Sequence, residues 1–188
     1  MSKTYKTKPN SSKKKKTKRV YKKKDYNSND GMLTSVWGPS AWHYIHTTSF
    51  NYPVQPSCDD KRNYRSFILN LRNVLPCGKC RINLCKNFKK HPLKRYHMKN
   101  RETFSKYVYQ LHETINKMLG KKSGLSYIDV RERYEHFRSR CSKTNQNNDI
   151  EKGCTEPLLG EKSKCVLQIV PDKKKCDTFQ IDEKCVKK

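Results

Sequence analysis

The sequence lacks a long apolar run and is poor in acidic residues. Hydrophobic residues make up 33% of its 188 residues, against about 45–50% in ordinary globular domains. No apolar run approaches the length that a bilayer requires, which excludes a transmembrane helix, and no apolar segment follows the basic N-terminus, which argues against an ordinary secretory signal. With 43 Lys and Arg against 17 Asp and Glu, the net charge is +26. This composition does not describe one uniformly packed domain, so we expect part of the chain to be disordered.

Charge and cysteine divide the chain into three parts. Residues 1–30 hold 12 Lys and Arg against 2 Asp and Glu, and we expect a disordered Lys-rich tail there. Residues 31–141 are expected to form the folded domain. Residues 142–188 should be a small cysteine-rich extension in which residues 166–170 form a strand. Its cysteines, expected to act mainly as staples, are Cys154, Cys165, Cys176 and Cys185.

The folded domain is predicted to be all-α, because apolar residues recur there at helical spacing between helix-capping and helix-breaking residues. The pattern indicates a four-helix bundle with a short fifth helix, since each apolar stripe needs a partner face. The first helix is expected to begin at Gly38-Pro39, with Pro39 in the first helical position, and the second to end before Pro76. The third should begin near Cys77, and the fourth should run from Asn100 to Gly120. The short fifth helix should contain Val130 and Phe137.

Cys77-Gly78-Lys79-Cys80 is the first candidate for chemistry. At a helix N-terminus the unpaired N–H groups and the helix dipole both stabilise a thiolate, which suits disulfide exchange. The alternative is half of a zinc site, completed by Cys85, His91 and His97. Redox chemistry is favoured because the spacing fits no common zinc pattern, so no metal is expected.

Two pairs of polar and aromatic residues lie one helical turn apart. Trp42 and His46 form one pair, and His112 and Asn116 form the other. In isolation, a core tryptophan beside a satisfied histidine explains the first pair, and half-exposed residues at the edge of an apolar stripe explain the second. A ligand with ring nitrogens and phosphates would also provide the partners that such polar groups need.

Taken together, these motifs give the chain a specific resemblance. In order and spacing it resembles the Erv/ALR flavin-linked sulfhydryl oxidases over about residues 36–140, and most of all the members that large DNA viruses encode. The residues that carry the resemblance are Trp42 and His46, then Cys77 and Cys80, then His112, Asn116, Leu119, Gly120 and Lys121, then Arg133 and Tyr134.

The resemblance implies a helical bundle that binds FAD, with the Cys-x-x-Cys helix against the isoalloxazine ring. It assigns a catalytic role to Cys77, attacked by the substrate thiol, and to Cys80, which faces the flavin. Dioxygen would then receive the electrons and become hydrogen peroxide. The residues that it assigns to FAD binding are Trp42, His46, His112, Asn116, Leu119, Lys121, Arg133 and Tyr134.

The chain departs from the family pattern at several positions. Glu113 stands where an asparagine is usual, and Tyr134 replaces a tryptophan. The family's extra structural disulfide should fall near Thr103 and Leu125-Ser126, and neither end is cysteine here. No cysteine precedes residue 58, so a relay pair could come only from the cysteines from Cys141 onward. Nine cysteines leave one unpaired, and the best candidates for free thiols are Cys58 and Cys85.

For partners we expect thiol-containing proteins, met directly or through a thioredoxin-like carrier, together with dioxygen and a second copy of the chain in a homodimer. No membrane association is expected, and the location should be the host cytoplasm, the virion or both. Residues 1–30 should attract nucleic acid weakly and without sequence preference. The alternative from another class is a basic, zinc-stapled nucleic-acid-binding protein, which the lysine blocks favour but the aromatic and histidine motifs do not.

Overall fold

The structure is a computed structural model that describes residues 22–140, 154, 156–171, 173–174 and 181–185. The chain divides into two units, Met1–Asp30 and Gly31–Lys188. In the first unit, helix α1 (Lys23–Tyr26) is a single turn without buried residues. The disordered tail stays a prediction, and residues 1–21 lie outside the described residues.

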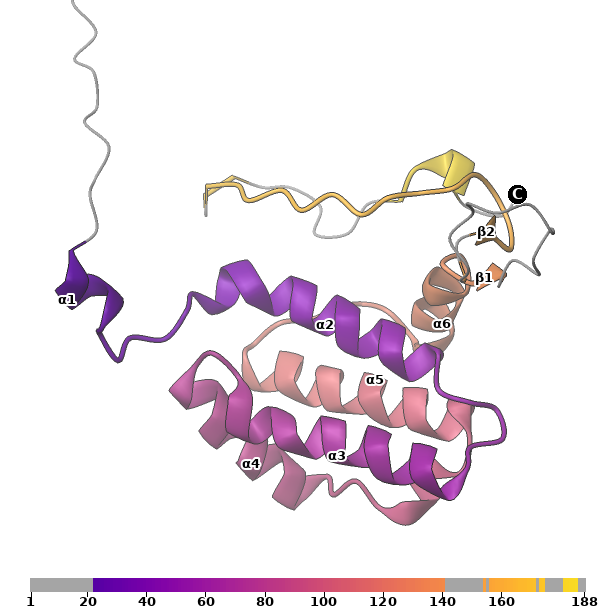
Figure 1. Cartoon of the computed structure of the whole chain (residues 1–188), viewed down its shortest axis with the longest axis horizontal. Coiled ribbons are helices and arrows are strands. Elements are labelled where there is room, and N and C mark those ends of the chain that lie inside the picture. Colours follow the sequence, from indigo (N-terminus) through magenta and orange to yellow (C-terminus); the bar gives the residue numbers. More distant parts are fainter. Residues whose placement is uncertain (1–21, 141–153, 155, 172, 175–180, 186–188) are drawn as a thin grey trace, which may run out of the picture. The chain divides into compact units, whose positions relative to one another are not determined.

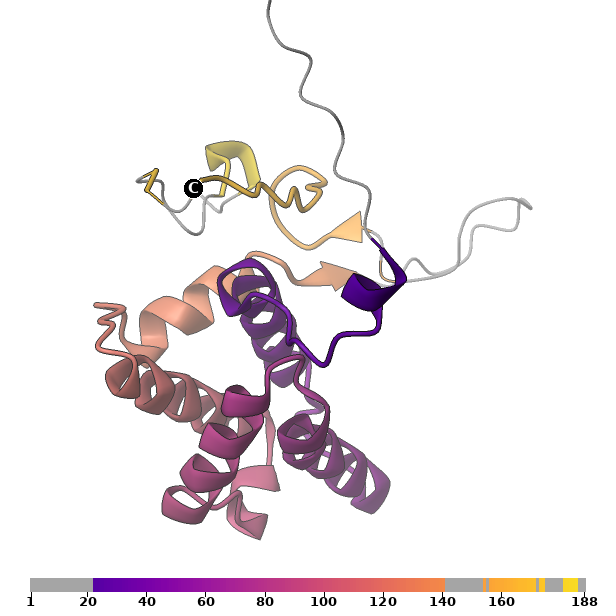
Figure 2. The same cartoon turned by 90° about the vertical axis from the view of Figure 1, so that its left-hand side faces the viewer.

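Four long helices make up the bundle of the second unit, as predicted (Figure 1). They are α2 (Thr34–Phe50), α3 (Cys58–Val74), α4 (Gly78–Lys90) and α5 (Arg101–Met118). Helix α2 packs on α5, and α3 packs on α4, with a 3-10 helix, η1 (Arg95–Met98), against α5. The turned view in Figure 2 shows the same helices more nearly end-on. The short fifth helix of the prediction is α6 (Tyr127–Glu135), which contacts both α2 and α5.

Side-chain caps fix where the helices of the bundle begin. The side chain of the N-cap residue accepts a hydrogen bond from the backbone N–H of the third helical residue at the starts of α3, α4, α5 and α6. This bond satisfies one of the N–H groups that a helix leaves unpaired at its start. After α5, Gly120 adopts the left-handed conformation (φ 68°) that favours glycine at a helix end. The cap residues are Ser57, Cys77, Asn100 and Ser126.

Helix α2 begins earlier than predicted, because Pro39 lies inside it rather than at its first position. Proline removes the N–H that would bond the carbonyl of Ser35, yet tertiary contacts hold the preceding turn. The indole Nε1 of Trp37 donates to the carbonyl of Met32 at 3.1 Å. The N–H of Met32 in turn donates to the carbonyl of Pro76 at 2.9 Å, which ties the start of α2 to the start of α4. One of these two bonds is local and the other is long-range, and together they outweigh the signal of the proline.

The core lies between α2, α3, α4 and α5. Phe104, Val108, Ile68 and Tyr52 are fully buried, and the Tyr52 hydroxyl donates to the carbonyl of Met98 at 3.0 Å. The buried phenol therefore keeps a hydrogen-bond partner, which avoids the cost of an unpaired polar group. This packed centre holds the helix starts and the aromatic residues of α2 and α5 in fixed positions.

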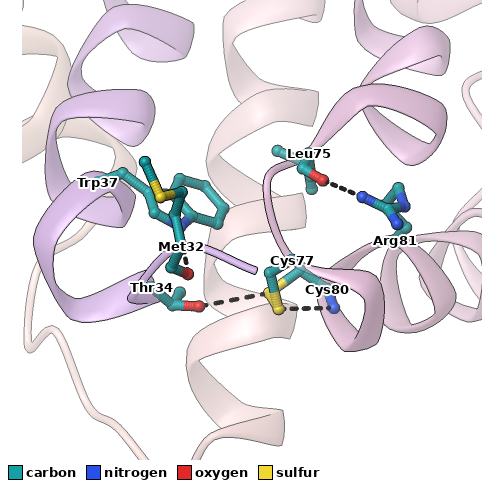
Figure 3. The surroundings of a disulfide bond; sticks show 7 residues. All are labelled: Met32, Thr34, Trp37, Leu75, Cys77, Cys80 and Arg81. Atoms are coloured by element: carbon teal, nitrogen blue, oxygen red, sulfur yellow. Dashed lines mark hydrogen bonds between the residues drawn. A yellow bond between two sulfur atoms is a disulfide. The ribbon is translucent and has the colours of Figure 1, made fainter. Parts of the chain in front are cut away.

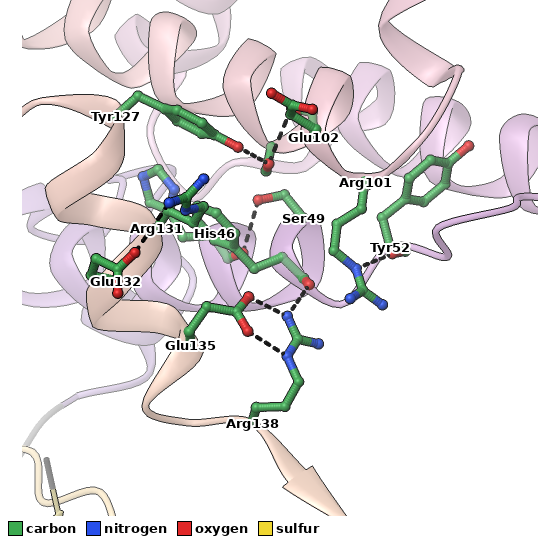
Figure 4. Close-up of polar contacts among 12 residues, drawn as sticks. His46, Ser49, Tyr52, Arg101, Glu102, Tyr127, Arg131, Glu132, Glu135 and Arg138 are labelled. Atoms are coloured by element: carbon green, nitrogen blue, oxygen red, sulfur yellow. Dashed lines mark hydrogen bonds and ion pairs between the residues drawn. The ribbon is translucent and has the colours of Figure 1, made fainter. Parts of the chain in front are cut away.

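The C-terminal end of α2 is closed by polar contacts to α5 and α6 (Figure 4). Arg138 pairs with Glu135 and donates to the carbonyl of Phe50 at 2.9 Å. Arg101 donates to the carbonyl of Tyr52 at 2.6 Å. These bonds satisfy carbonyls at the end of α2 that have no partner within the helix.

Hydrogen bonds also join α5 to the start of α6 and to the residues just before it, near the place where the resemblance would put a disulfide. The hydroxyls of Ser105 and Tyr127 lie 2.9 Å apart, and the Tyr109 hydroxyl donates to the carbonyl of Leu125 at 2.8 Å. Neither Thr103 nor Leu125-Ser126 supplies a cysteine. The connection at this place is therefore polar rather than covalent.

The C-terminal extension differs from the prediction. Its only described ladder pairs β1 (Ser139–Arg140) with β2 (Glu156–Pro157) in antiparallel fashion, and a single 3-10 turn, η2 (Glu183–Cys185), follows. The prediction of a strand over residues 166–170 is wrong. Among the described residues no strand pairs with this segment, and its apolar side chains are largely exposed.

The cysteines of the extension are not all staples either. Cys154 is disulfide-bonded, whereas Cys165 and Cys185 are free thiols, so stapling is wrong for these two. Cys141 and Cys176 lie outside the described residues. In the folded domain Cys58 and Cys85 are free, which confirms the expectation for both. Within the described part of the chain, no helix combines the length and apolarity needed to cross a bilayer.

Candidate redox and cofactor site

Cys77 and Cys80 form a disulfide at the start of α4 (Figure 3). Cys77 is the N-cap residue, and its Sγ accepts the N–H of Cys80 at 3.2 Å. Both cysteines are half-buried, so neither is sealed from a substrate. When the pair is reduced, the same N–H and the positive end of the helix stabilise a thiolate on Cys77.

A segment from the start of α2 lies against this disulfide. The hydroxyl of Thr34 is 3.6 Å from the Sγ of Cys80, within hydrogen-bond distance for sulfur. Gly31 approaches the start of α4 so closely that a Cβ atom there would lie 2.8 Å from the carbonyl oxygen of Pro76. The sequence could not reveal Thr34, because 46 residues separate it from Cys80 and no local motif marks it.

Positive charge surrounds the disulfide. Helix α4 has no acidic residue in its first turn, and Lys79 and Arg81 flank Cys80. The guanidinium of Arg81 donates to the carbonyl of Leu75, the residue that follows α3 (Figure 3). Nearby cations favour the thiolate over the thiol, so this helix start is suited to thiol–disulfide exchange.

An aromatic cluster joins α2, α5 and α6. The rings of Trp42 and His112 are stacked, with centroids 3.9 Å apart and planes 6° from parallel. The Nε2 atom of His46 lies 2.9 Å from the Nδ1 atom of His112. Tyr134 stacks on His46 from α6, at 5.4 Å between centroids. The structure thus brings together four of the residues that the sequence assigned to a cofactor, from three helices.

Both clustered histidines are held neutral. Burial, with His112 and then His43 as further causes, lowers the pKa of His46 to about 3. Burial also lowers the pKa of His112 to about 4, where Glu113 opposes the shift and Lys121 adds to it. The His46–His112 hydrogen bond requires one ring nitrogen to accept, which agrees with neutral rings. The Nδ1 atom of His46 is buried and has no hydrogen-bond partner in the structure.

The other predicted cofactor residues lie around this cluster with varied exposure. The amide of Asn116 donates to Glu113 Oε1 at 2.9 Å, so the residue that departs from the family pattern holds this asparagine. Lys121 is exposed but close enough to affect the pKa of His112. Arg133 is half-buried on α6, beside Tyr134. Leu119 is 55% exposed and is not brought into the cluster.

The zinc interpretation finds no support in the described part of the chain. No three His, Cys, Asp or Glu side chains gather there in a way that would hold a metal ion. Cys85 is a free thiol, and the Nδ1 atom of His97 accepts the backbone N–H of Lys94 at 3.0 Å. The residues that the zinc alternative grouped with Cys77 and Cys80 therefore do not converge on them.

Comparisons with known proteins give a consistent result. Residues 39–148 match the Erv1/Alr family. A mimivirus protein named "Probable FAD-linked sulfhydryl oxidase R368" is 35% identical over 116 residues, which cover 62% of this chain and 80% of that protein. An African swine fever virus protein (isolate Pig/Kenya/KEN-50/1950) named "FAD-linked sulfhydryl oxidase" is 30% identical over 99 residues, covering 53% and 80%. The yeast Erv1 core crystal structure matches the fold, with a TM-score of 0.50, 22% identity, and 63% and 93% coverage.

Proposed function

Since this chain belongs to the Erv1/Alr family of FAD-linked sulfhydryl oxidases, we propose that Cys77 and Cys80 are the cysteines through which it oxidises thiols. The observation that carries the proposal is the disulfide between them at the start of α4, with its sulfur bonded to a helix N–H. The other described cysteines of the folded domain, Cys58 and Cys85, are unpaired. An unpaired cysteine cannot accept two electrons by opening a disulfide.

The aromatic cluster fits the FAD of this family. The buried, unpartnered Nδ1 atom of His46 needs a hydrogen-bond partner, which a flavin or adenine ring system can supply. The flat faces of Trp42 and His112 suit ring stacking, and Lys121 and Arg133 provide positive charge for phosphates. Bound FAD supplies the capacity to take an electron pair from thiols and pass it to dioxygen. We therefore propose that these residues, with Tyr134 and Asn116, hold it.

Thiol–disulfide exchange begins with attack by a substrate thiolate on the Sγ of Cys77. A mixed disulfide forms, the bond between Cys77 and Cys80 breaks, and Cys80 leaves as a thiolate. The hydroxyl of Thr34 donates to that sulfur and so stabilises the leaving thiolate. Exchange is faster when the leaving thiol has a low pKa. We thus assign Thr34 a positioning role for Cys80.

The second step releases the oxidised substrate. A second substrate thiolate attacks the substrate sulfur of the mixed disulfide, and Cys77 leaves as a thiolate, stabilised by the N–H of Cys80. The substrate has then lost two electrons and two protons, and the electrons reside on the reduced pair. Lys79 and Arg81 offset the negative charge that develops there.

Trapping with a chromogenic disulfide tests the order of the two cysteines. In Cys80→Ser, the remaining Cys77 should react with 5,5′-dithiobis(2-nitrobenzoate) and keep the adduct, which peptide mass spectrometry locates. In Cys77→Ser, the reaction at Cys80 should be slower. Faster labelling of Cys80 than of Cys77 would reverse the assigned roles. If the two variants keep the oxidase activity of the wild type, neither cysteine belongs to the site.

Partners and location extend this proposal. We infer thiol-containing proteins as substrates, met directly or through a thioredoxin-like carrier, and a homodimer, which exposed apolar side chains at Val36, Val74 and Ile82 support. Sedimentation velocity tests the dimer. The viral relatives support a location in the host cytoplasm, the virion or both, which immunogold labelling of infected cells would test.

The Lys-rich tail has a separate proposed role. Its 12 Lys and Arg support weak attraction to nucleic acid without sequence preference. It contains no cysteine. Removal of residues 1–30 should therefore leave oxygen consumption with dithiothreitol unchanged; if it halves that rate, the tail belongs to the redox site.

A further inference from the structure

Basic residues are concentrated in one stretch of the sequence, which runs from α3 through α4 to the loop that follows. The stretch from Lys61 to Arg101 contains 13 Lys and Arg and no Asp or Glu. All but Arg81 and Arg101 are exposed. Within the described part of the chain, only Arg62 of this set makes an ion pair, with Asp59. Most of this positive charge is therefore not neutralised by the protein itself.

A pocket opens where α4 ends, beside η1 and the middle of α5. Its volume is about 230 Å³, and its lining residues include Lys90, His91, Lys94, Tyr96, His97 and Gln110. None of them belongs to the disulfide or to the aromatic cluster of Trp42 and His112. No acidic side chain lines it.

Aromatic rings form one wall of the pocket. Tyr96 is 61% exposed, and its ring lies 3.9 Å from that of His97, centroid to centroid. The ring of His97 lies 4.6 Å from that of Tyr107 behind it, and its Nδ1 atom accepts the N–H of Lys94. The imidazole is therefore fixed, and Tyr96 presents an open aromatic surface beside Lys94. Exposed aromatic rings flanked by cations are the features by which proteins bind single-stranded nucleic acids.

We propose that this pocket binds the base and phosphate of a nucleotide unit in single-stranded nucleic acid. The base stacks on the exposed ring of Tyr96, which His97 supports from within, and Lys90 and Lys94 contact the flanking phosphates. Bases of any type have an aromatic face, so the site has no strong sequence preference.

The surroundings favour a strand over other anions. Exposed cations also stand close in sequence to the pocket residues, at Lys86, Lys89, Arg95 and Lys99, and they are available for further phosphates of a strand. The pocket is smaller than the roughly 300–1,000 Å³ typical of small-molecule sites, which suits one base better than a dinucleotide. An acidic protein would use the charge but leave the exposed ring of Tyr96 without a specific role.

A matched pair of tyrosine variants tests the stacking. Tyr44 is 62% exposed on α2, nearly the same as Tyr96, and lies outside the pocket. Binding of a fluorescent 20-nucleotide oligothymidylate to the full-length protein, measured by anisotropy, should weaken about tenfold in Tyr96→Ala. Tyr96→Phe should retain the affinity, and Tyr44→Ala should leave it unchanged. Equal effects of Tyr96→Ala and Tyr44→Ala would overturn the proposal.

Paired lysine variants separate the pocket from the tail. Each phosphate contact on a single strand contributes about 0.7 to the slope of log affinity against log salt. Lys90→Gln with Lys94→Gln should therefore reduce that slope by about 1.4. In Lys23→Gln with Lys24→Gln, the effect of Tyr96→Ala should persist, since the tail does not supply the stacking surface. If Tyr96→Ala has no effect with the tail intact, and Lys23→Gln with Lys24→Gln alone weakens binding, the tail rather than the pocket binds the strand.

Competitors distinguish the sources of the anion. Thymidine monophosphate should compete at least a hundredfold more weakly than the 20-nucleotide strand; equal competition would assign the pocket to free nucleotides. Polyglutamate is the competitor that represents an acidic protein. If it displaces the strand at equal charge, and if Tyr96→Ala does not change the affinity for the strand, the surface is a docking site for acidic proteins and the proposal is overturned.

Discussion

Two helices of the bundle start at a cysteine, and the two starts carry opposite charge. Helix α4 is capped by Cys77, and its first residues include Lys79 and Arg81 but no acid. Helix α3 has Cys58 as its first residue, followed by Asp59 and Asp60. The helix dipole favours a thiolate at both places. The neighbouring charges reinforce that effect at α4 and oppose it at α3.

The cap chemistry differs in the same sense. At α3, the hydroxyl of Ser57 and the carboxylate of Asp60 satisfy the backbone N–H groups of the first turn, and the Cys58 thiol is left exposed and unpaired. At α4 the sulfur of Cys77 itself accepts the helix N–H. We therefore propose that Cys77, which is the cap and has basic neighbours, is the more reactive of the two cysteines, and that a position at a helix start is insufficient by itself.

The largest effect is expected when one sulfur of the Cys77–Cys80 pair is removed. Cys77→Ser or Cys80→Ser should abolish oxygen consumption with dithiothreitol, because the remaining thiol has no partner for a disulfide. Bound FAD and helicity, followed by visible absorption and circular dichroism, should stay near wild type. Cys58→Ser is the matched control and should keep full activity. An active Cys80→Ser protein would refute the assignment.

The cofactor cluster provides the next largest effect. His112→Ala removes a ring that stacks on Trp42 and bonds His46. Each unpaired buried group costs about 1–3 kcal/mol, so FAD retention should weaken roughly tenfold to a hundredfold. The melting temperature should fall, and added FAD should restore part of it because FAD binds only the folded protein. If excess FAD shifts the variant as it shifts the wild type, the α5 residues do not hold FAD.

The pair of His46 and His112 predicts that the stability of the folded protein depends on pH. The pKa values of His46 and His112 in the folded protein, about 3 and about 4, lie below the usual value near 6.5. From pH 6.5 down toward 4 the unfolded chain takes up protons that the folded chain does not, so the unfolding free energy falls with falling pH. Thermal melts between pH 7.5 and 5 should show this fall, and it should be shallower in His112→Ala than in His91→Gln, a change at an exposed histidine.

The sequence was sufficient for elements whose signals are local. The all-α bundle followed from apolar stripes, and the cap of α5 followed from Asn100. The start of α2 did not, because Pro39 gives a strong local signal that the bonds of Trp37 and Met32 override. The apolar run at residues 166–170 failed as a strand for the converse reason: its local preference finds no partner among the described residues.

The candidate site divides in the same way. Spacing grouped Trp42 with His46 and Cys77 with Cys80, since each pair lies within one turn. The resemblance assigned Trp42 and His112 to one cofactor site, but the direct stacking of their rings was not predicted and comes from the fold. Thr34 had neither kind of signal, and only the fold places its hydroxyl beside Cys80.

A smaller effect is expected when the hydroxyl of Thr34 is removed, since this group lies at the start of α4 and has no counterpart in the cap of α3 described above. Thr34→Val keeps the shape but removes the hydroxyl near the Cys80 sulfur. A lost hydrogen bond of about 1 kcal/mol should lower the thiolate fraction of reduced Cys80 roughly fivefold at a given pH below its pKa. Thiolate absorbance at 240 nm, titrated in the Cys77→Ser background, measures this pKa. Thr34→Ser should restore the wild-type value, whereas a purely structural role would leave the pKa the same in Thr34→Val.

The smallest expected effect arises at Cys58, at the start of α3. Asp59 is exposed and pairs with Arg62 on the solvent side of α3, so Asp59→Asn should change stability little. It removes a negative charge next to Cys58, and a nearby negative charge disfavours the thiolate that reacts with iodoacetamide. A charge at a helix N-terminus is worth about 0.3–1 kcal/mol, so Cys58 alkylation by iodoacetamide at pH 7 should accelerate roughly twofold to fivefold. Lys79→Gln is the reciprocal change at α4, and it should slow attack by reduced Cys77 to a similar extent in the Cys80→Ser background. Two results would show that local charge does not cause the difference in alkylation rate between the two cysteines: unchanged rates in both variants, or effects that 0.5 M salt does not diminish. The hydrogen bond from the helix N–H to the Cys77 sulfur and the hydroxyl of Thr34 would then account for the difference.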